Sequence, residues 1–215
     1  MTPEEMQQVL AEQMRQQREA QMRAAMMGGA TGADPNQRQE QYRGRQAQQK
    51  YAIIAAVEIN HGGFSYNGDI PWYYPEDFKH FKEQTMGHIC IMGRNTYEDI
   101  NKRLGEKAKD SVLPDRKCFV VSKTLTELPN ATVIPNIRHV EFYTEDTDNP
   151  VYIIGGRRLF IEGIAIADEL HLTIVNKEVD CDMFFPIKTV GNKFKVDSVK
   201  DTENPEIKFF KFVRK

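Results

Sequence analysis

Residues 89–97 read ICIMGRNTY, and residues 151–160 read VYIIGGRRLF. Each stretch opens with a short apolar run rich in β-branched residues, which predicts a buried strand that ends in a glycine-containing turn before a helix. The first helix is predicted to start at Tyr97, with Thr96 and Asp99 spaced as a capping box. Because parallel α/β sheets bind ligands beyond the carboxyl ends of their strands, the two turns predict both the fold class and the position of a site.

The same alternation of strands and helices continues along the chain. The predicted strands cover residues 51–57, 89–92, 117–121, 151–154, 170–175, 194–200 and 206–213, the last two forming a hairpin. The predicted helices cover residues 75–85, the segment from 97 onward, and the segment from the Gly155-Gly156 pair to about 163. This order predicts an α/β fold with a mixed, mostly parallel central sheet flanked by helices and an antiparallel C-terminal hairpin.

Both glycine turns place free backbone N–H groups at the start of a helix, where partial positive charge favours a phosphate group. Glycine allows a phosphate to approach the backbone closely, and Arg94, Arg157 and Arg158 add positive charge at the same places. Two such turns on one sheet suit a dinucleotide, although ordinary helix-entry turns explain the glycines equally well. The usual Rossmann and P-loop sequences are absent.

The composition divides the chain near Lys50. Residues 1–50 contain 12 Gln and a single aromatic residue, Tyr42, whereas residues 51–215 hold nearly all the aromatic side chains. We therefore expect one folded domain over residues 51–215, which is a usual single-domain size, and an extension over residues 1–50.

The extension begins with a helix signal, because Thr2 can act as a cap and Pro3 suits the first helical position. We expect a helix over about residues 3–27 and a flexible linker after it. Two interpretations remain: a frayed helix with a disordered linker, or a docking helix for an unidentified protein partner. The extension lacks an apolar signal core and carries several Glu residues, which argues against a targeting peptide, so we expect a cytoplasmic protein.

The charge and the reactive residues exclude several classes of function. A net charge of -2 argues against nucleic-acid binding driven by bulk charge, and no apolar run reaches the ~18–20 residues of a membrane span. Three cysteines cannot form a disulfide framework, and the five histidines lack the spacing of ligand pairs. We therefore expect no metal site, buried free thiols and surface histidines.

The helix predicted over residues 75–85 carries an acidic side chain beside its apolar face. At about 100° per residue, the inward stripe consists of Tyr74, Phe78, Phe81 and Thr85. Asp77 lies at the edge of this stripe, where burial would raise its pKa and the helix N-terminus would lower it. A carboxyl group poised toward neutral pH suits proton transfer, whereas the simpler alternative is an ordinary acidic residue in a first helical turn.

Taken together, residues 51–215 strongly resemble dihydrofolate reductase. The matching motifs are, in chain order, Ile54-Ala55-Ala56, Gly63, Asn67–Trp72, Pro75–Lys82, Ile91–Glu98, Leu113–Arg116, Val121-Ser122, Ile154–Gly156, Leu172-Thr173 and Asp182–Pro186. The joint order and spacing of Pro-Trp, the helical Asp, Met-Gly-Arg-x-Thr and Gly-Gly are very specific. The resemblance implies the fold of that family and a monomeric reductase domain.

The resemblance also implies reduction of 7,8-dihydrofolate to 5,6,7,8-tetrahydrofolate, with hydride transfer from NADPH to C6 and protonation at N5. Asp77 matches the ionisable residue of the pterin pocket, Thr173 matches the hydroxyl that bonds it, and Trp72 matches a residue that holds a water. Arg116 matches the arginine that binds the α-carboxylate of the substrate's glutamate. The apolar substrate slot is expected to be lined by Ile54, Phe78, Phe81, Ile100 and Ile154.

For NADPH, the resemblance implies a larger set of contacts. The expected residues are Ala56, Gly63, Gly93, Arg94, Asn95, Thr96, Val121, Ser122, Lys123, Gly155, Gly156, Arg157, Arg158, Leu159 and Phe160. Arg94, Ser122 and Lys123 would face the 2′-phosphate and favour NADPH over NADH. The Gly155-Gly156 pair matches one joined by a cis peptide in the family, and the loop over residues 62–70 resembles a mobile lid.

Four features depart from the family pattern. Asn95 stands where a basic residue is frequent, and Phe160 stands where tyrosine is frequent. Met183 replaces the usual Thr of an Asp-Thr-x-x-Pro pattern. The stretch Lys102–Val112 is longer than usual, which puts Lys102 in doubt as a second contact for the glutamate tail.

Two other functions remain open from the sequence. The chain would be either a related NADPH-dependent pteridine or riboflavin-pathway reductase, or a structural protein that reuses the fold and docks through residues 1–50. The Pro71-Trp72 pair, Asp77 and Arg116 argue against the first. Since the chain ends at Lys215, we expect no thymidylate synthase segment to follow.

Overall fold

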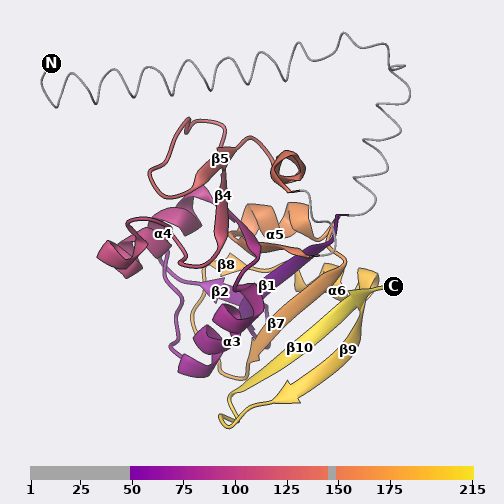
Figure 1. Ribbon diagram of the computed structural model, residues 1–215. Coiled ribbons are helices and arrows are strands. Elements are labelled where there is room, and N and C mark those ends of the chain that lie inside the picture. Colours follow the sequence, from indigo (N-terminus) through magenta and orange to yellow (C-terminus); the bar gives the residue numbers. More distant parts are fainter. Residues whose placement is uncertain (1–48, 145–148) are drawn as a thin grey trace, which may run out of the picture. The chain divides into compact units, whose positions relative to one another are not determined.

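The computed structural model describes residues 49–144 and 149–215, so the predicted N-terminal helix and linker lie outside the described residues. The main strands are β1 (Tyr51–Glu58), β3 (Ile89–Gly93), β4 (Lys117–Val121), β5 (Thr132–Ile134), β6 (Val151–Gly155), β7 (Glu169–Val175), β9 (Phe194–Asp201) and β10 (Ile207–Arg214). They form one sheet in the order β5-β4-β3-β6-β1-β7-β10-β9. Figure 1 shows this sheet running from β5 at the top to β9 at the lower right.

Strand β1 lies inside the sheet and pairs in parallel with β6 on one side and with β7 on the other. Strands β3, β4 and β5 continue the parallel part, whereas β10 runs antiparallel to both β7 and β9. The apolar residues of β1 are mostly buried on both faces of the sheet, as expected for a central parallel strand. The predicted fold class is therefore confirmed.

Two apolar cores lie on the two faces of the sheet, because successive side chains of a strand point to opposite faces. Ile54 of β1 belongs to a cluster with Tyr97, and the neighbouring Ile53 belongs to another cluster with Leu159 and Val190. Tyr97 belongs to α4 (Arg94–Leu104), Leu159 to α5 (Arg157–Gly163) and Val190 to α6 (Ile187–Lys193). The remaining helix, α3 (Pro75–Thr85), carries Asp77. Helix α4 therefore packs on the opposite face of the sheet from α5 and α6.

Helix α4 starts earlier than predicted, at Arg94 rather than Tyr97, and Thr96 does not cap it. Its N-cap residue is Gly93, which makes no side-chain cap and has an extended backbone. The Thr96 hydroxyl instead faces the second glycine turn, because a Cβ built on Gly156 would lie 3.3 Å from Thr96 Oγ1.

Several short elements were not predicted. These are the two-stranded ribbon of β2 (Gly63–Ser65) and β8 (Met183–Phe184), strand β5, helix α6, and the 3₁₀ helices η1 (Gly105–Ala108) and η2 (Ile137–Tyr143). Each is too short to show a clear hydrophobic period, so its conformation depends on contacts with distant parts of the chain.

The thiols and histidines follow the expectation only in part. Cys90 and Cys118 are buried and free, as expected. The expectation of surface histidines is wrong for His171, whose side chain is only 10% exposed. His171 packs beside Tyr152 and lies 3.2 Å from Glu169 through its Nε2 atom, so a polar partner compensates its burial.

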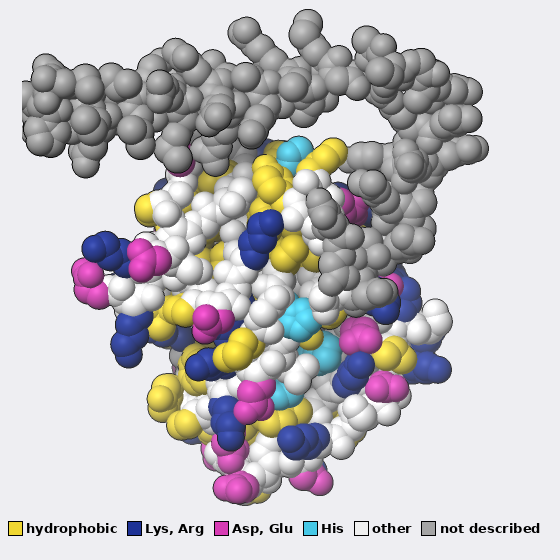
Figure 2. All heavy atoms as spheres, in the orientation of Figure 1, with side chains coloured by type: hydrophobic (Ala, Val, Ile, Leu, Met, Phe, Trp, Pro, Cys, Tyr) yellow, Lys and Arg dark blue, Asp and Glu magenta, His cyan; other side chains and the backbone are white. Residues whose placement is uncertain are grey.

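Charged side chains of both signs are interspersed over the face drawn in Figure 2. None of the helices in the described part of the chain combines the length and apolar character needed to cross a membrane. Within the same residues, no group of three or more His, Cys, Asp or Glu side chains is arranged to hold a metal ion.

Candidate active site

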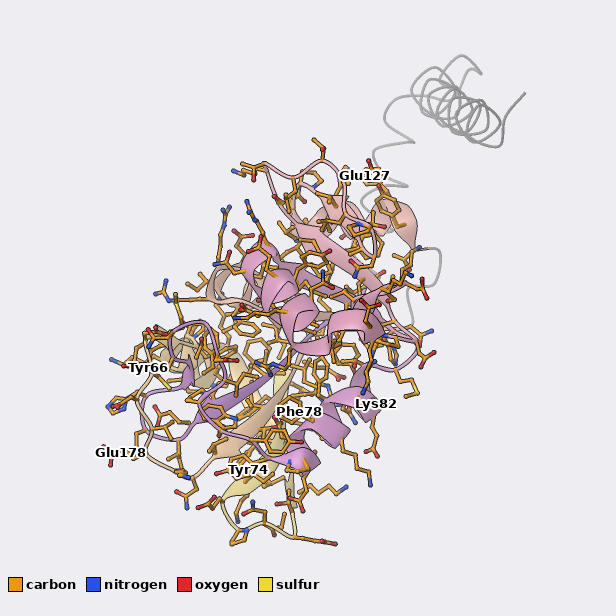
Figure 3. The ribbon with its side chains drawn as sticks, turned by 90° about the vertical axis from the view of Figure 1, so that its left-hand side faces the viewer. Tyr66, Tyr74, Phe78, Lys82, Glu127 and Glu178 are labelled. Atoms are coloured by element: carbon orange, nitrogen blue, oxygen red, sulfur yellow. The ribbon has the colours of Figure 1, made fainter. Side chains whose placement is uncertain are left out.

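A cavity of about 470 Å³ is lined by the carboxyl-terminal halves of β1 and β6, by α3 and α4, and by the loop ending at Ile70. Figure 3 shows Tyr74, Phe78 and Lys82 along α3, with Tyr66 of the loop at the left. The predicted site residues that line the cavity are Ile54, Ala56, Asp77, Phe78, Phe81, Thr96, Ile100, Arg116, Ile154, Gly155, Gly156 and Phe160. Those that do not line it are Gly63, Trp72, Gly93, Arg94, Asn95, Val121, Ser122, Lys123, Arg157, Arg158, Leu159 and Thr173.

Asp77 and Thr173 form a hydrogen-bonded pair at the cavity wall. Thr173 Oγ1 of β7 donates to Asp77 Oδ1 at 2.6 Å, and Thr173 is only 3% exposed. Burial raises the pKa of Asp77 above its ordinary value, and the hydrogen bond from Thr173 offsets only part of this rise. A carboxyl group in this state can retain a proton at higher pH than an exposed aspartate, which suits proton transfer to a bound molecule.

The start of α3 determines where Asp77 points. Pro75 occupies the first turn, where its fixed φ suits a helix, and the Tyr74 hydroxyl donates to Glu206 Oε2 at 2.7 Å. The Asp77 backbone N–H donates to the Tyr74 carbonyl at 3.0 Å. The helix start is thus tied to the turn before β10, which holds the Asp77 side chain against β7.

The walls beside Asp77 are apolar. Phe78 and Phe81 line the cavity from α3, Ile100 lines it from α4, and Ile54 and Ile154 line it from the sheet. Apolar walls with a few placed polar groups are typical of sites for flat organic ligands, and they exclude water from the polar group between them.

Arg116 is held in one orientation by neutral partners. Its Nε donates to Thr85 Oγ1 at 3.1 Å, its Nη1 donates to the Pro114 carbonyl at 2.7 Å, and its guanidinium lies 5.9 Å from the Phe81 ring centroid. The buried Thr85 hydroxyl in turn donates to the Phe81 carbonyl at 2.7 Å. A guanidinium fixed in this way beside a cavity suits the recognition of a carboxylate.

The two glycine turns meet where β3 and β6 end side by side. Met92 pairs with Gly155, and the peptide bond between Gly155 and Gly156 is cis, as the resemblance implied. Gly155 has a φ of +119°, and a Cβ there would lie 3.1 Å from the Phe160 ring. Only glycine therefore fits there, and Gly155 and Gly156 line the cavity beside the N-terminus of α4, whose free N–H groups favour an anion.

The end of β4 lies next to the first of these turns. Val121 pairs with Gly93, so the residues after Val121 leave the sheet beside the start of α4. Ser122 Oγ accepts hydrogen bonds from the backbone N–H groups of Thr124 and Leu125, which orders this turn. The structure thus brings together the turn at Gly93 and the segment after Val121, both of which were expected to contact the same cofactor.

The arginines of the two turns lie along the surfaces of their own helices. Arg94 Nε lies 2.6 Å from Glu98 Oε1, and Arg158 Nε lies 2.8 Å from Glu162 Oε1. All four side chains are substantially exposed, and exposed ion pairs of this kind contribute little free energy. Either arginine can therefore exchange its partner for a phosphate at small cost.

Glu58 organises the loop that follows β1, a role that the sequence analysis missed. Its buried carboxylate accepts hydrogen bonds from the N–H groups of Asn60 at 2.7 Å, His61 at 2.5 Å and Gly63 at 3.2 Å. Burial alone would raise the pKa of Glu58, but these donors hold it below its ordinary value. An acidic residue directly after an apolar strand was the available signal.

A second contact links this loop to residues 181–182, directly before the ribbon strand β8. A Cβ on Gly63 would lie 2.5 Å from Cys181 Cβ, so the close approach requires glycine there. Farther along the loop, the Asn67 N–H donates to Asp182 Oδ2 at 2.8 Å. Gly63 therefore shapes the loop, although it does not line the cavity itself.

Trp72 lies beside the cavity rather than in its lining. It packs in a small core with Tyr74, Val175 and Ile207. Its Nε1 atom is buried and has no hydrogen-bond partner among the described residues. The indole N–H is therefore an unused hydrogen-bond donor inside that core.

Comparisons with known proteins agree with this fold. A family profile described as dihydrofolate reductase matches residues 50–214. A bifunctional dihydrofolate reductase-thymidylate synthase of Paramecium tetraurelia is 31% identical over 156 residues, covering 72% of this chain and 32% of that protein. The chain thus spans about a third of that relative's length.

Two shorter proteins match over most of their own length. The dihydrofolate reductase of Bacillus subtilis is 32% identical over 143 residues, covering 65% of this chain and 79% of that protein. The solved structure of the Enterococcus faecalis dihydrofolate reductase, complexed with NADP(H) and RAB-propyl, has the same fold with a TM-score of 0.66. It is 23% identical and covers 78% of this chain and 97% of its own. The chain therefore belongs to the dihydrofolate reductase family, whose members are NADPH-dependent oxidoreductases.

Proposed function

We propose that this chain reduces 7,8-dihydrofolate to 5,6,7,8-tetrahydrofolate. The observation that supports this most strongly is the Asp77–Thr173 pair at the wall of an apolar cavity that also includes Thr96 and the Gly155-Gly156 pair. NADPH supplies the hydride that C6 of the pterin receives, and a proton is added at N5. The protein positions the two molecules, excludes water and controls the proton.

The residues present fit a dinucleotide cofactor. The glycine turns provide backbone N–H groups beside a helix N-terminus, and Thr96, Gly155 and Gly156 line the cavity there. The residues proposed to hold NADPH are Ala56, Gly63, Gly93, Arg94, Asn95, Thr96, Val121, Ser122, Lys123 and Gly155 through Phe160. In this proposal Arg94 exchanges Glu98 for the 2′-phosphate, next to Ser122 and Lys123.

Asp77 performs the proton work in this proposal. Thr173 occupies Oδ1 of the carboxyl group, so Oδ2 is the oxygen that bonds the pterin ring. The raised pKa of Asp77, caused by burial, lets the site keep a proton near the pterin and favours protonation at N5. Trp72 assists by holding the water that carries this proton, through its buried and unused Nε1 donor.

Arg116 binds the α-carboxylate of the substrate's glutamate. Its orientation is set in advance by Thr85 and Pro114, so little side-chain freedom is lost when the carboxylate arrives. The apolar residues between Arg116 and Asp77 then enclose the rings of the substrate, with Phe78 and Phe81 on one side and Ile100 on the other.

The direct test is an assay of the full chain with NADPH and dihydrofolate, followed by the absorbance of NADPH at 340 nm. We expect consumption of NADPH that requires dihydrofolate and yields tetrahydrofolate. A folded sample that binds NADPH but shows no turnover would contradict the proposal. Turnover of a riboflavin-pathway pyrimidine in place of dihydrofolate would favour the related reductase.

A further inference from the structure

The side of α3 that rests on the sheet carries a histidine close to Asp77. At about 100° per residue, His80 lies about 60° around the helix from Asp77, and both side chains contact the β7–β10 part of the sheet (Figure 1). The ring of His80 stacks on the ring of Phe209 of β10, with centroids 3.9 Å apart and an angle of 13° between the ring planes. Phe209 is the direct partner of Thr173 in the pairing of β10 with β7. The helix therefore touches two neighbouring positions of the sheet, Thr173 through Asp77 and Phe209 through His80.

The stacked rings hold the middle of α3. The Tyr74 hydroxyl already ties the start of the helix to Glu206, and the hydrogen bond with Thr173 fixes Asp77 itself. A contact almost one turn after Asp77, between two flat rings, adds a restraint on the rotation of the helix about its own axis. His80 does not line the cavity, so any effect on a ligand passes through the placement of Asp77.

Two basic side chains lie near His80 on the same face of the sheet. Lys200 of β9 pairs directly with Phe209, the residue on which His80 stacks. His171 lies on β7 two residues before Thr173, and alternate residues of a strand point to the same face. A proton on His80 would thus be placed beside the charge of Lys200 and beside a second imidazole.

The nearest carboxylate of the sheet is already engaged. Glu169 Oε2 lies 3.2 Å from His171 Nε2 and 3.1 Å from Lys211 Nζ. Lys211 is the direct partner of His171 in the pairing of β10 with β7, so Glu169 serves both of them. Its charge is therefore committed within the sheet and leaves α3 without a compensating anion from below.

Other groups favour a proton on His80, so the balance decides its charge. Glu83 lies almost one turn later on α3, 59% exposed and 3.9 Å from Lys79, and Glu76 lies one turn earlier. The Phe209 ring also attracts a cation above its face. Burial, His171 and Lys200 outweigh these groups and hold the pKa of His80 below its ordinary value of 6.5. The stack at neutral pH is therefore one of two uncharged rings.

We propose that His80 is a positioning residue for Asp77, whose uncharged ring seats α3 on the strands of Phe209 and Thr173 and whose protonation releases the helix from them. Since only the seated helix presents Asp77 beside Thr173, substrate binds the seated form and shifts the population toward it. Mild acid should therefore raise the KM for dihydrofolate, whereas saturating substrate restores the seat and leaves kcat unaffected by His80. Only this substrate effect rests on the proposed function.

The first measurement is amide hydrogen exchange of residues 75–85 in the full chain at pH 7.5 and 5.5, corrected for the intrinsic effect of pH, with residues 157–163 of α5 as the reference. We expect the protection of α3 to fall about threefold to tenfold at pH 5.5, since about tenfold is the limit for one proton with an ordinary pKa of 6.5. His80→Phe keeps a flat ring that cannot be protonated and should remove this fall. Asp77 titrates in both proteins, so the difference between them reports His80.

The second measurement is the KM for dihydrofolate at the same two pH values. The ratio of KM at pH 5.5 to KM at pH 7.5 should be about twofold to fivefold larger for the wild type than for His80→Phe, with equal kcat ratios. His80→Ala removes the ring and should raise the KM at pH 7.5, which His80→Phe should restore. Lys200→Gln should reduce the pH effect because it removes a cation beside His80, whereas Lys195→Gln, near the other end of β9, should leave the effect unchanged.

Several outcomes would overturn the proposal. Equal pH effects in the wild type and in His80→Phe would mean that another group titrates, and α3 protection that increases in acid would mean that the charged ring binds Glu76 or Glu83. A fall in protection shared equally by α5 would indicate general unfolding rather than release of one helix. If His80→Phe fails to fold, equal pH effects in Lys200→Gln and Lys195→Gln reject the proposal instead. A wild-type chain without turnover would reject the proposed function, while hydrogen exchange still tests the seat of α3.

Discussion

The α3 side of the cavity and the glycine-turn side are built in different ways. On the α3 side, Asp77 and Arg116 are held by hydrogen bonds from or to Thr173, Thr85 and the Pro114 carbonyl, and neither needs a partner of opposite charge. On the glycine-turn side, the backbone is rigidly shaped, but the arginines lie in exposed pairs with glutamates of their own helices. The side chains of the α3 side are therefore oriented before any ligand binds. The arginines of the glycine-turn side must first leave their glutamate partners to bind a ligand.

This difference separates the expected effects of mutation. Groups that are already oriented contribute to transition-state stabilisation without reorganisation, so their loss affects turnover or substrate affinity strongly. Cations that must first leave an exposed pair contribute less, and their loss affects only the ligand that they bind.

The largest effect is expected for Asp77→Asn. The amide keeps the acceptor for Thr173 but cannot supply a proton, so turnover at neutral pH should fall about 100-fold or more. NADPH affinity should stay within about twofold, since Asp77 lies on the other side of the cavity from the glycine turns. Steady-state kinetics and a fluorescence titration measure the two quantities. A parallel loss of both would make Asp77 a structural residue and remove the contrast between the two sides.

The next largest effect is expected for Arg116→Ala. Loss of a pre-oriented, charge-assisted carboxylate contact should raise the KM for dihydrofolate about 10- to 100-fold and leave NADPH affinity unchanged. Thr85→Val is the matched variant, because it keeps the charge of Arg116 while removing the acceptor of its Nε, together with the hydrogen bond from the hydroxyl to the Phe81 carbonyl, and it should give a smaller rise in KM. Equal effects of the two variants would mean that orientation, rather than charge, provides the whole contribution.

A smaller effect is expected for Arg94→Ala. The variant should weaken NADPH binding about tenfold, leave NADH binding nearly unchanged and leave the KM for dihydrofolate unchanged. Glu98→Gln frees Arg94 from its present partner and should strengthen NADPH binding slightly. Equal losses for NADPH and NADH would reject a contact with the 2′-phosphate.

The smallest effect concerns stability and pH. A carboxyl group whose pKa is raised in the folded state, as burial does for Asp77, favours folding while it is protonated and loses that advantage as pH rises through the raised value. Asp77→Asn should therefore have a higher Tm than the wild type at pH 7 to 8. The difference should vanish below the ordinary value of 3.8, where both states of the wild type are protonated. A Tm difference that does not depend on pH would contradict this explanation.

Sequence reasoning succeeded where a local pattern carries the information. The apolar runs before Gly93 and Gly155 predicted two strands of one mostly parallel sheet, and the structure places them side by side. The helical spacing around Asp77 predicted a carboxylate beside apolar side chains. Both features depend on residues close together in the chain, so one sequence is enough to recognise them.

The rest depends on contacts that no local residue pattern marks, some of them between residues far apart in the chain. Glu58 organises a loop through backbone N–H groups, and no residue type marks them as its partners. Thr85 appeared only as part of an apolar stripe, and its hydrogen bond with Arg116 joins positions 31 residues apart. The ion pair of Asp69 and Arg103 spans 34 residues and depends on the path of the loop, which the sequence pattern does not specify.

The most direct measurement of the central claim is the rate of hydride transfer in a single turnover, with NADPH bound to the full chain and dihydrofolate added across a range of pH. The account predicts a rate that falls as pH rises, with a midpoint above the ordinary aspartate value of 3.8, because burial raises the pKa of Asp77. It also predicts a low rate without this dependence for Asp77→Asn. A wild-type rate that does not vary with pH, or an Asp77→Asn variant that keeps the wild-type profile, would contradict the role assigned to Asp77.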